Sequence, residues 1–172
     1  MRIAIIGNSG SGKSTLALWL ANRAGVPLLD LDTVAWVPGQ IAVPRPASEA
    51  QEAVRDFCTA NANWVVEGCY ANLVAASLTF APTLIFLDPG EEACLAHCRN
   101  RPWESHKYAS KEAQDERLPF LLSWVGDYYR RDGDMSHAGH AACFDGYVGP
   151  KQVLRSALSL DPPSSEALAL AT

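Results

Sequence analysis

The residues with the clearest chemistry form a glycine-rich stretch near the N-terminus, Gly7-Asn8-Ser9-Gly10-Ser11-Gly12-Lys13-Ser14. It fits the pattern G-x-x-x-x-G-K-[ST], follows an apolar run at residues 3–6 and precedes helical periodicity at residues 14–24. In that context the glycines let successive backbone N–H groups surround a phosphate, and the helix N-terminus adds partial positive charge. We therefore predict that the phosphates of ATP, or of a close relative, are bound by Gly7, Ser9, Gly10, Ser11, Gly12, Lys13, Ser14 and Thr15.

Two residues of this stretch have predicted roles in phosphoryl transfer. Lys13 is expected to reach the β- and γ-phosphates, and Ser14 to ligate Mg²⁺ through its hydroxyl. Phosphoryl transfer needs positioning and charge cancellation more than covalent chemistry from the protein. We therefore predict that Lys13 is catalytic and that the cofactors are ATP and Mg²⁺. The alternative interpretation is an ordinary glycine-rich turn.

Three acidic residues lie at the ends of the next two apolar runs. Asp30 and Asp32 end a predicted strand over Val26–Leu31, and Glu67 follows Trp64–Val66. Alternate residues of a strand share a face, so both aspartates should face the carboxyl end of the sheet, where open α/β folds bind ligands. We predict that Asp32 is the base or anchor for a phosphoryl acceptor, and that Asp30 and Glu67 hold Mg²⁺-bound water. The alternatives are aspartates that cap the following turn and a glutamate on the surface.

Arginines supply the remaining candidate charges. Arg45 lies in a proline-rich segment where a flap could bind the acceptor, and Arg101, Arg117, Arg130 and Arg131 flank or follow a polar segment suited to a lid. A lid arginine can stabilise a transferring phosphoryl group, so Arg101 and Arg131 are the candidate catalytic pair. Surface or salt-bridge roles are the alternative for each of them. His137 and His140 are interpreted as solvated loop residues.

Periodicity predicts alternating strands and helices around these residues. Further strands are expected at residues 83–87 and 151–156, and further helices at residues 48–57, 91–101 and 118–129. Pro119 should lie near the first turn of the last helix, because a proline inside a helix removes a hydrogen bond. Residues 132–146 are rich in Gly, Asp, His and Ser, which predicts a mobile loop, and the tail at 161–172 is a short helix or frays.

Composition limits the possible partners. The 172 residues point to one domain, and 14 basic against 19 acidic residues offer no basic surface for a nucleic acid. No run is long enough to span a membrane, and the apolar start stops at Gly7 without a cleavage site, so we expect a cytoplasmic protein. The five cysteines form no Cys-x-x-Cys pair, which favours neither a disulfide framework nor a zinc site.

Several segments resemble the adenylate-kinase-related proteins called topology-modulation (FlaR-like) proteins. Besides the phosphate loop, residues 31–36 with Pro38 and Gly39 resemble that family's Leu-Asp-x-x-x-Trp-x-Pro-Gly, and residues 64–70 resemble its Trp-Val-Ile-Asp-Gly-Asn-Tyr. Residues 84–101 and 116–125 resemble its fourth strand, the helix that follows and its lid. Two departures bear on substrate choice, since Glu67 stands where the family has Asp and Cys69 where it has Asn.

This resemblance, which covers about residues 1–131, implies a P-loop NTPase fold of the nucleoside-monophosphate-kinase type. It implies a three-layer sandwich with a five-stranded parallel sheet, a substrate flap at about 33–60 and a lid at about 102–146. Asp30, Asp32, Trp36, Arg45 and Tyr70 then contact the acceptor, and the Asp-x-Asp spacing also resembles that of shikimate kinases.

The function implied is transfer of a phosphoryl group from ATP to a small molecule. The acceptor could be a nucleoside monophosphate, a nucleoside or a polyol acid, and the protein could be a monomer or a homodimer. The alternative is a nucleotide-binding regulator or slow ATPase without such an acceptor.

Overall fold

A five-stranded parallel sheet forms the centre of the computed structural model, which describes residues 1–37, 43–104, 109–156 and 158–171. Its strands lie in the order β2-β3-β1-β4-β5, and every neighbouring pair is parallel. The strands are β1 (Arg2–Gly7), β2 (Leu28–Asp30), β3 (Trp64–Gly68), β4 (Thr83–Leu87) and β5 (Lys151–Leu154). The predicted fold class, an α/β sandwich with a five-stranded parallel sheet, is confirmed.

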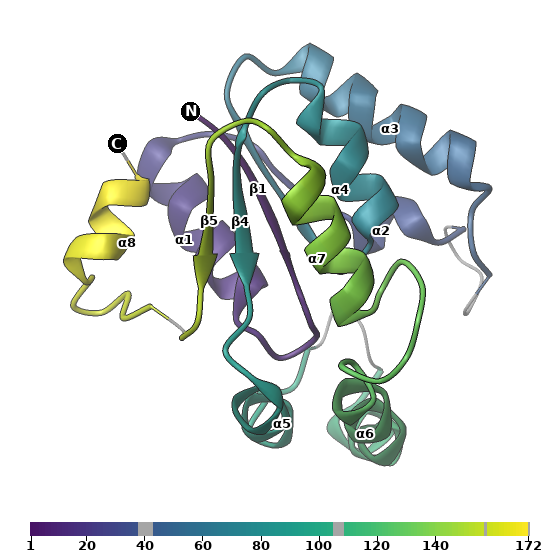
Figure 1. Cartoon of the computed structure of the whole chain (residues 1–172). Coiled ribbons are helices and arrows are strands. Elements are labelled where there is room, and N and C mark those ends of the chain that lie inside the picture. The colour runs from purple at the N-terminus through teal and green to yellow at the C-terminus, as the bar shows by residue number, and fades with distance from the viewer. Residues whose placement is uncertain (38–42, 105–108, 157, 172) are drawn as a thin grey trace.

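Helices cover both faces of this sheet (Figure 1). On one face lie α1 (Lys13–Ala24) and α8 (Ser165–Leu170). On the other lie α2 (Asp32–Ala35), α3 (Ala47–Ala60), α4 (Ala71–Leu78) and α7 (His137–Gly146). The remaining pair, α5 (Glu91–Arg99) and α6 (Lys111–Gly126), pack on each other beyond the carboxyl end of the strands.

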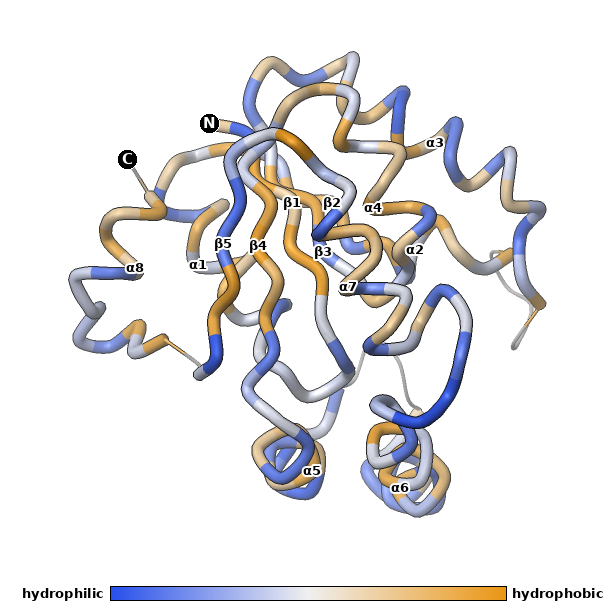
Figure 2. Tube along the Cα trace, viewed as in Figure 1, coloured by the Kyte–Doolittle hydropathy of each residue, from blue (hydrophilic) through white to orange (hydrophobic). Residues whose placement is uncertain are grey.

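The central strand β1 is apolar throughout because both of its faces are buried. Ile3 and Ile5 point into the core beneath α1, whereas Ala4 and Ile6 point into the core beneath α3, α4 and α7. Parallel strands covered by helices on both sides show this continuous apolar pattern. Figure 2 shows the sheet as a hydrophobic centre, with hydrophilic residues along the outer side of α3. None of the described helices has the length and apolar character needed to cross a membrane.

The second strand ends earlier than predicted. β2 stops at Asp30, and the chain turns at Leu31 into α2, so Asp32 is the first residue of a short helix and not part of the strand. The prediction that the two aspartates share one face of a strand is therefore wrong. Residues 38–42, which include Pro38 and Gly39 of the resembling segment, lie outside the described residues.

Three predictions for the later part of the chain are also wrong. α6 begins at Lys111, because Ser110 caps it by accepting the Ala113 N–H, and Pro119 lies inside the helix and not in its first turn. The predicted loop at 132–146 is helical from His137 onward, and α7 packs on α4, β1 and β4. His140 is fully buried, so its interpretation as a solvated residue is wrong. The fifth strand and the short tail helix are confirmed.

Candidate functional site

The phosphate loop joins β1 to α1 at the carboxyl end of the sheet. Gly10 and Gly12 have φ angles of +78° and +94°, a left-handed conformation that a side chain makes unfavourable. A Cβ on Gly7 would lie 2.5 Å from the Leu87 carbonyl oxygen, and one on Gly10 would lie 2.3 Å from that of Cys94. The motif glycines are therefore required by the backbone path as well as by close approach to a phosphate.

Two polar side chains fasten this loop to the helices behind it. The buried Asn8 accepts the Ser9 N–H at 2.9 Å and donates to the Val125 carbonyl at 3.1 Å. His97 of α5 contacts the Gly10 carbonyl oxygen at 2.7 Å through Nδ1, which must carry the proton because a carbonyl oxygen is an acceptor. These contacts connect the loop to both α5 and α6, and the spacing of the motif gave no sign of either.

Glu67 provides a buried carboxylate beside the loop lysine. It ends β3 with a side chain only 3% exposed, and its Oε2 lies 3.9 Å from the Lys13 ammonium. That oxygen is buried without a hydrogen-bond partner. Burial raises the pKa of Glu67, the Lys13 ammonium lowers it, and Asp30 raises it again. The alternative of a surface glutamate is therefore excluded.

The two aspartates have different surroundings. Asp30 Oδ1 accepts the Asp32 N–H at 2.9 Å, the turn-capping contact that was the alternative for this residue. Asp32 Oδ1 accepts the Tyr70 hydroxyl at 2.8 Å, and the Trp36 indole N–H donates to that hydroxyl at 2.9 Å. Burial raises the pKa of Tyr70, so its hydroxyl keeps its proton and orients the Asp32 carboxylate.

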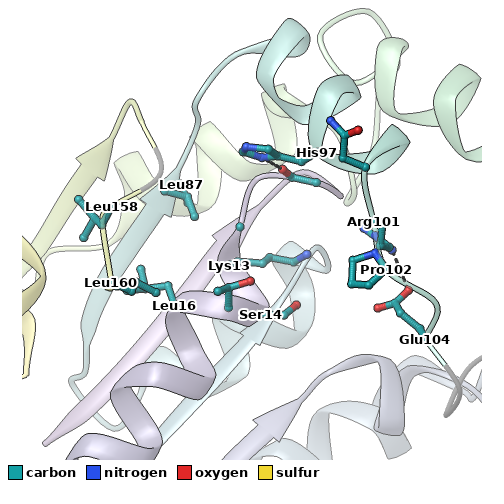
Figure 3. Close-up of a pocket in the computed structure, with 14 residues that line it drawn as sticks. Lys13, Ser14, Leu16, Leu87, His97, Arg101, Pro102, Glu104, Leu158 and Leu160 are labelled. Carbon is teal, nitrogen blue, oxygen red and sulfur yellow. Dashed lines mark hydrogen bonds and ion pairs between the residues drawn. The ribbon is translucent and has the colours of Figure 1, made fainter. Parts of the chain in front are cut away.

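A cavity of about 470 Å³ lies over the phosphate loop (Figure 3). Lys13 and Ser14 form its floor, with Leu158 and Leu160 on one side and Arg101, Pro102 and Glu104 on the other. The two leucines come from the segment after β5, which the motifs did not indicate. An apolar wall beside a phosphate loop suits the base of a nucleotide.

A second cavity of about 210 Å³ adjoins the first. The two share four lining residues, Lys13, Ser14, Arg101 and Glu104. The other residues lining this second cavity come from four places in the chain and are Ser9, Asp30, Asp32, Glu67, Gly68, Cys69 and Leu121. Seven site residues predicted from the sequence therefore meet in this second cavity, namely Ser9, Lys13, Ser14, Asp30, Asp32, Glu67 and Arg101.

The other predicted residues have different positions. Tyr70 contacts Asp32 directly, and Trp36 contacts Tyr70. Among the described residues that line the two cavities, neither these two residues nor Arg45 is found. Arg131 donates to the carbonyl oxygens of Met135 and Trp124, and its guanidinium lies 3.7 Å from the centroid of the Trp124 ring. It therefore fixes the connection between α6 and α7, and its catalytic role stays a prediction.

The residues present fit a Mg²⁺–nucleotide complex. Lys13 and the positive end of α1 suit phosphates, and Ser14 offers a hydroxyl at the start of the helix. The unsatisfied Glu67 Oε2 lies in the same cavity as Ser14, where an acceptor is available for a water bound to a metal ion. The two carboxyl groups at Asp30 and Asp32 add oxygen atoms of the kind that Mg²⁺ sites use.

Comparisons with known proteins identify the fold. No protein-family model matches the chain, and no curated protein matches its sequence. A gluconokinase from Sinorhizobium meliloti 1021 is similar in structure, with a TM-score of 0.58 and 18% identity over 99% of this chain and 90% of that one. A shikimate kinase from Acinetobacter baumannii in complex with shikimate has a TM-score of 0.42 and 19% identity over 82% of this chain and 89% of that one. The likeness to the gluconokinase structure shows that the chain shares its α/β fold.

Proposed function

We propose that this chain is a P-loop kinase that transfers the γ-phosphoryl group of ATP to the hydroxyl group of a small molecule. The observation that carries the proposal is the pair of adjoining cavities, which share Lys13, Ser14, Arg101 and Glu104. A phosphate loop alone serves any nucleotide-binding protein. A second cavity with carboxylates directly beside it is what a phosphoryl acceptor requires, because donor and acceptor must meet in line.

On the donor side, Mg²⁺-bound ATP supplies the transferable phosphoryl group. The backbone N–H groups of the loop and the Lys13 ammonium bind the phosphates, and the Ser14 hydroxyl ligates the metal ion. Glu67 and Asp30 accept hydrogen bonds from water on that ion. Leu158 and Leu160 contact the base, and Arg101 neutralises charge that develops at the phosphoryl group.

On the acceptor side, Asp32 takes the proton of the attacking hydroxyl. Tyr70 holds the carboxylate through Oδ1, and Trp36 holds Tyr70, so both residues position the base. This assignment differs from the one implied by the resemblance, in which Trp36 and Tyr70 contact the acceptor directly. Membership of the topology-modulation family remains part of the proposal, as does a role for Arg45 from the flap.

We propose that the moving part of the molecule is α6. In α6 the buried residues are Val125 and Gly126, whereas α7 packs on the sheet through Phe144 and the buried His140. We therefore place the lid at α6, a shorter segment than the 102–146 expected from the sequence, of which residues 105–108 lie outside the described residues. Its closure excludes water, which would otherwise take the phosphoryl group.

One observation favours the alternative of a slow ATPase or nucleotide-dependent regulator. The Arg101 guanidinium is paired with Glu104 at 3.1 Å, and that of Arg131 is bound to backbone carbonyls. Neither arginine is therefore aimed at a phosphoryl group before a substrate binds. Under the kinase proposal, lid closure turns Arg101 away from Glu104.

The variant Asp32→Asn tests the kinase proposal. Asn keeps the shape of Asp but cannot take a proton, so we expect ATP affinity within about twofold of the parent and acceptor-dependent turnover reduced at least about 100-fold. Asp56→Asn, on the exposed side of α3, is the matched control and should leave both unchanged. Unchanged turnover in Asp32→Asn would show that this residue is not the base.

A further inference from the structure

Arg101 lies where the two cavities meet, on a segment that is neither helix nor strand. Arg101 and Glu104 line both the 470 Å³ and the 210 Å³ cavity (Figure 3). Residues 101–104 follow α5 without forming a regular element. The hydrogen-bond ladder of a helix or sheet therefore does not fix the path of this segment, and contacts from neighbouring elements must do so.

Gln114 of α6 supplies such contacts through both ends of its side-chain amide. Its Oε1 accepts the Glu104 N–H at 2.8 Å, and its Nε2 donates to the Pro102 carbonyl at 3.1 Å. One planar amide thus bonds two main-chain groups of the same segment, which fixes the orientation of that segment as well as its distance from α6. No motif in the sequence indicated this glutamine.

These contacts also bear on the Arg101 side chain. Its guanidinium lies 3.1 Å from the Glu104 carboxylate, and the Glu104 N–H is the group that Gln114 accepts. Because this ion pair is formed within the segment, a fixed backbone path from 102 to 104 also fixes the distance between its two members. Gln114, Arg101 and Glu104 line a further small cavity of about 10 Å³ together.

The helix that carries Gln114 is joined to the site near both of its ends. Gln114 lies near the start of α6, and the Val125 carbonyl near its end accepts the Asn8 amide of the phosphate loop at 3.1 Å. At 1.5 Å per residue, Gln114 and Val125 are about 16 Å apart along the helix axis. A rotation of α6 about the end that Asn8 holds therefore displaces Gln114 more than Val125, and displaces residues 102–104 with it.

We propose that Gln114 is a positioning residue of the phosphoryl-transfer reaction, which couples α6 to Arg101 and sets where the guanidinium lies over the phosphate loop. The inference rests on the proposed function, in which Arg101 neutralises charge that develops at the phosphoryl group. Gln114 contacts neither substrate and acts through the segment that it holds. Its contribution should appear in turnover and not in ATP affinity, because that charge develops only in the transition state.

The variant Gln114→Met removes both hydrogen bonds and keeps a side chain of similar length and helix propensity. We expect turnover at saturating ATP to fall at least about tenfold, while the Kd of ATP stays within about twofold. Turnover is measured by ADP release and product mass, from Mg²⁺, ATP and a panel of nucleosides, sugars and polyol acids. Asp115→Asn, which breaks the exposed pair of Asp115 and Lys111 on the same helix, is the matched control and should leave both quantities unchanged.

A double-mutant cycle with Arg101→Ala separates positioning from a structural role. Arg101→Ala alone should lower turnover at least about 100-fold, since a catalytic arginine can supply more than this. If Gln114 acts through Arg101, Gln114→Met should change turnover less than about twofold in the Arg101→Ala background, because coupled residues are not additive. A glutamine that acts through the stability of α6 would give the same loss in both backgrounds.

NMR tests the contact itself without any activity. The Glu104 N–H donates to Gln114 in the free protein, and loss of a hydrogen bond moves an amide proton resonance upfield. The Glu104 amide proton should therefore shift upfield in Gln114→Met and keep its position in Asp115→Asn. An unchanged resonance in Gln114→Met would show that the glutamine does not hold the segment, and would overturn the inference.

The outcomes separate the inference from the function on which it rests. A fall in turnover for Gln114→Met that disappears in the Arg101→Ala background supports both. Unchanged turnover, or an equal fall in both backgrounds, would overturn the inference and leave the kinase proposal intact. A parent that binds ATP and forms no phosphate monoester from any member of the panel would contradict the kinase proposal, and the inference would fall with it.

Discussion

At the scale of single residues, the proposed chemistry depends on how Asp32 is held. Its carboxylate accepts one hydrogen bond from Tyr70, which in turn accepts one from Trp36. The order of donors is fixed, since an indole N–H only donates and burial raises the pKa of the tyrosine. These two hydrogen bonds therefore orient the Asp32 carboxylate, and Tyr70 keeps its own proton, so the carboxylate stays able to accept one from a substrate.

Removing the Tyr70 hydroxyl should weaken this arrangement. In Tyr70→Phe the carboxylate loses a directed donor and the Trp36 indole loses its acceptor. A hydrogen bond to a charged group contributes about 1.5–3 kcal/mol, so we expect acceptor-dependent turnover to fall about tenfold or more while ATP affinity is kept. Steady-state kinetics and calorimetry on one preparation measure both.

The matched control for this variant is Tyr147→Phe. That tyrosine donates to the Pro82 carbonyl at 2.6 Å, which is not among the residues lining either cavity. It should keep its turnover and lose only some stability. Equal losses of turnover in the two tyrosine variants would mean that Tyr70 acts through folding and not through Asp32.

His140 gives the protein a predictable dependence on pH. It is fully buried, donates from Nε2 to the Cys69 carbonyl and accepts the Tyr128 hydroxyl at Nδ1, so it is the neutral tautomer. Burial lowers its pKa from 6.5 to about 4. Between these values the unfolded chain binds a proton that the folded chain does not, and the free energy of unfolding should fall as pH falls from about 6.5 to about 4.

The size of this effect is set by the pKa difference and reaches up to about 3 kcal/mol. Urea unfolding of the parent and of His140→Gln at pH 7, 6 and 5 should show the smaller loss in the variant. NMR titration of the parent should leave the His140 ring neutral at pH 5.5. A ring that titrates near pH 6.5 in the folded protein would contradict the buried neutral state.

At the scale of elements, the proposed division lies between a mobile α6 and a fixed α7. α6 buries little apolar surface and is joined to the phosphate loop near its end through the contact between Asn8 and Val125. α7 is anchored by His140 and by Phe144, whose ring lies 6.0 Å from that of Phe86. Local stability follows such burial.

Hydrogen exchange should separate these two helices. We expect fast exchange over most of α6 in the free protein, protection there when an ATP analogue and an acceptor bind together, and slow exchange in α7 throughout. An ATP analogue alone should protect mainly the phosphate loop. Slow exchange in α6 that ligands leave unchanged would remove the lid from the proposal and favour the slow ATPase.

Helices and strands were predicted correctly where a motif or an apolar pattern in the local sequence indicates them. The predictions were wrong where contacts with distant parts of the chain determine the structure. The phosphate loop and the strands have motif or apolar patterns that require no knowledge of the rest of the chain. α7 contains Gly139 and two histidines and is stabilised by packing on Phe86, which its own residues do not reveal. The predicted start of α6 was wrong because we expected Pro119 to lie in the first turn of the helix. Pro119 lies inside α6, where packing of the helix compensates for the low helix propensity of proline.

The candidate site shows the same limit. Asp32 was selected from its spacing to Asp30 on a strand, yet the chain turns at Leu31 and Asp32 reaches the cavity from a short helix. Leu158 and Leu160 line the nucleotide cavity from far along the chain, and Glu104 lines both cavities. No motif indicated these three residues, since only the fold brings them to the phosphate loop.

At the scale of the whole molecule, the fold gathers the site at one edge. The phosphate loop follows β1, and Asp30 and Glu67 lie at the carboxyl ends of β2 and β3. The carboxyl ends of these three strands are neighbours in the sheet. α5 and α6 lie beyond this edge (Figure 1). Leu158 and Leu160, from the segment after β5, line the cavity over the phosphate loop. A parallel sheet thus brings donor and acceptor residues from distant parts of the chain within reach of Lys13.

The central claim, transfer of a phosphoryl group to a small acceptor, is tested most directly by product formation. The protein is incubated with Mg²⁺, ATP labelled in its γ-phosphoryl group and a panel of small hydroxyl-bearing molecules that includes nucleosides, sugars and polyol acids, and the label is followed into a phosphate monoester by mass spectrometry. We predict a labelled phosphate monoester of one of these acceptors, together with ADP release at least about tenfold above the rate without acceptor. Excess EDTA and the variant Lys13→Ala should each abolish it. Release of labelled inorganic phosphate alone, at the same rate with and without acceptors, would contradict the claim and identify a slow ATPase.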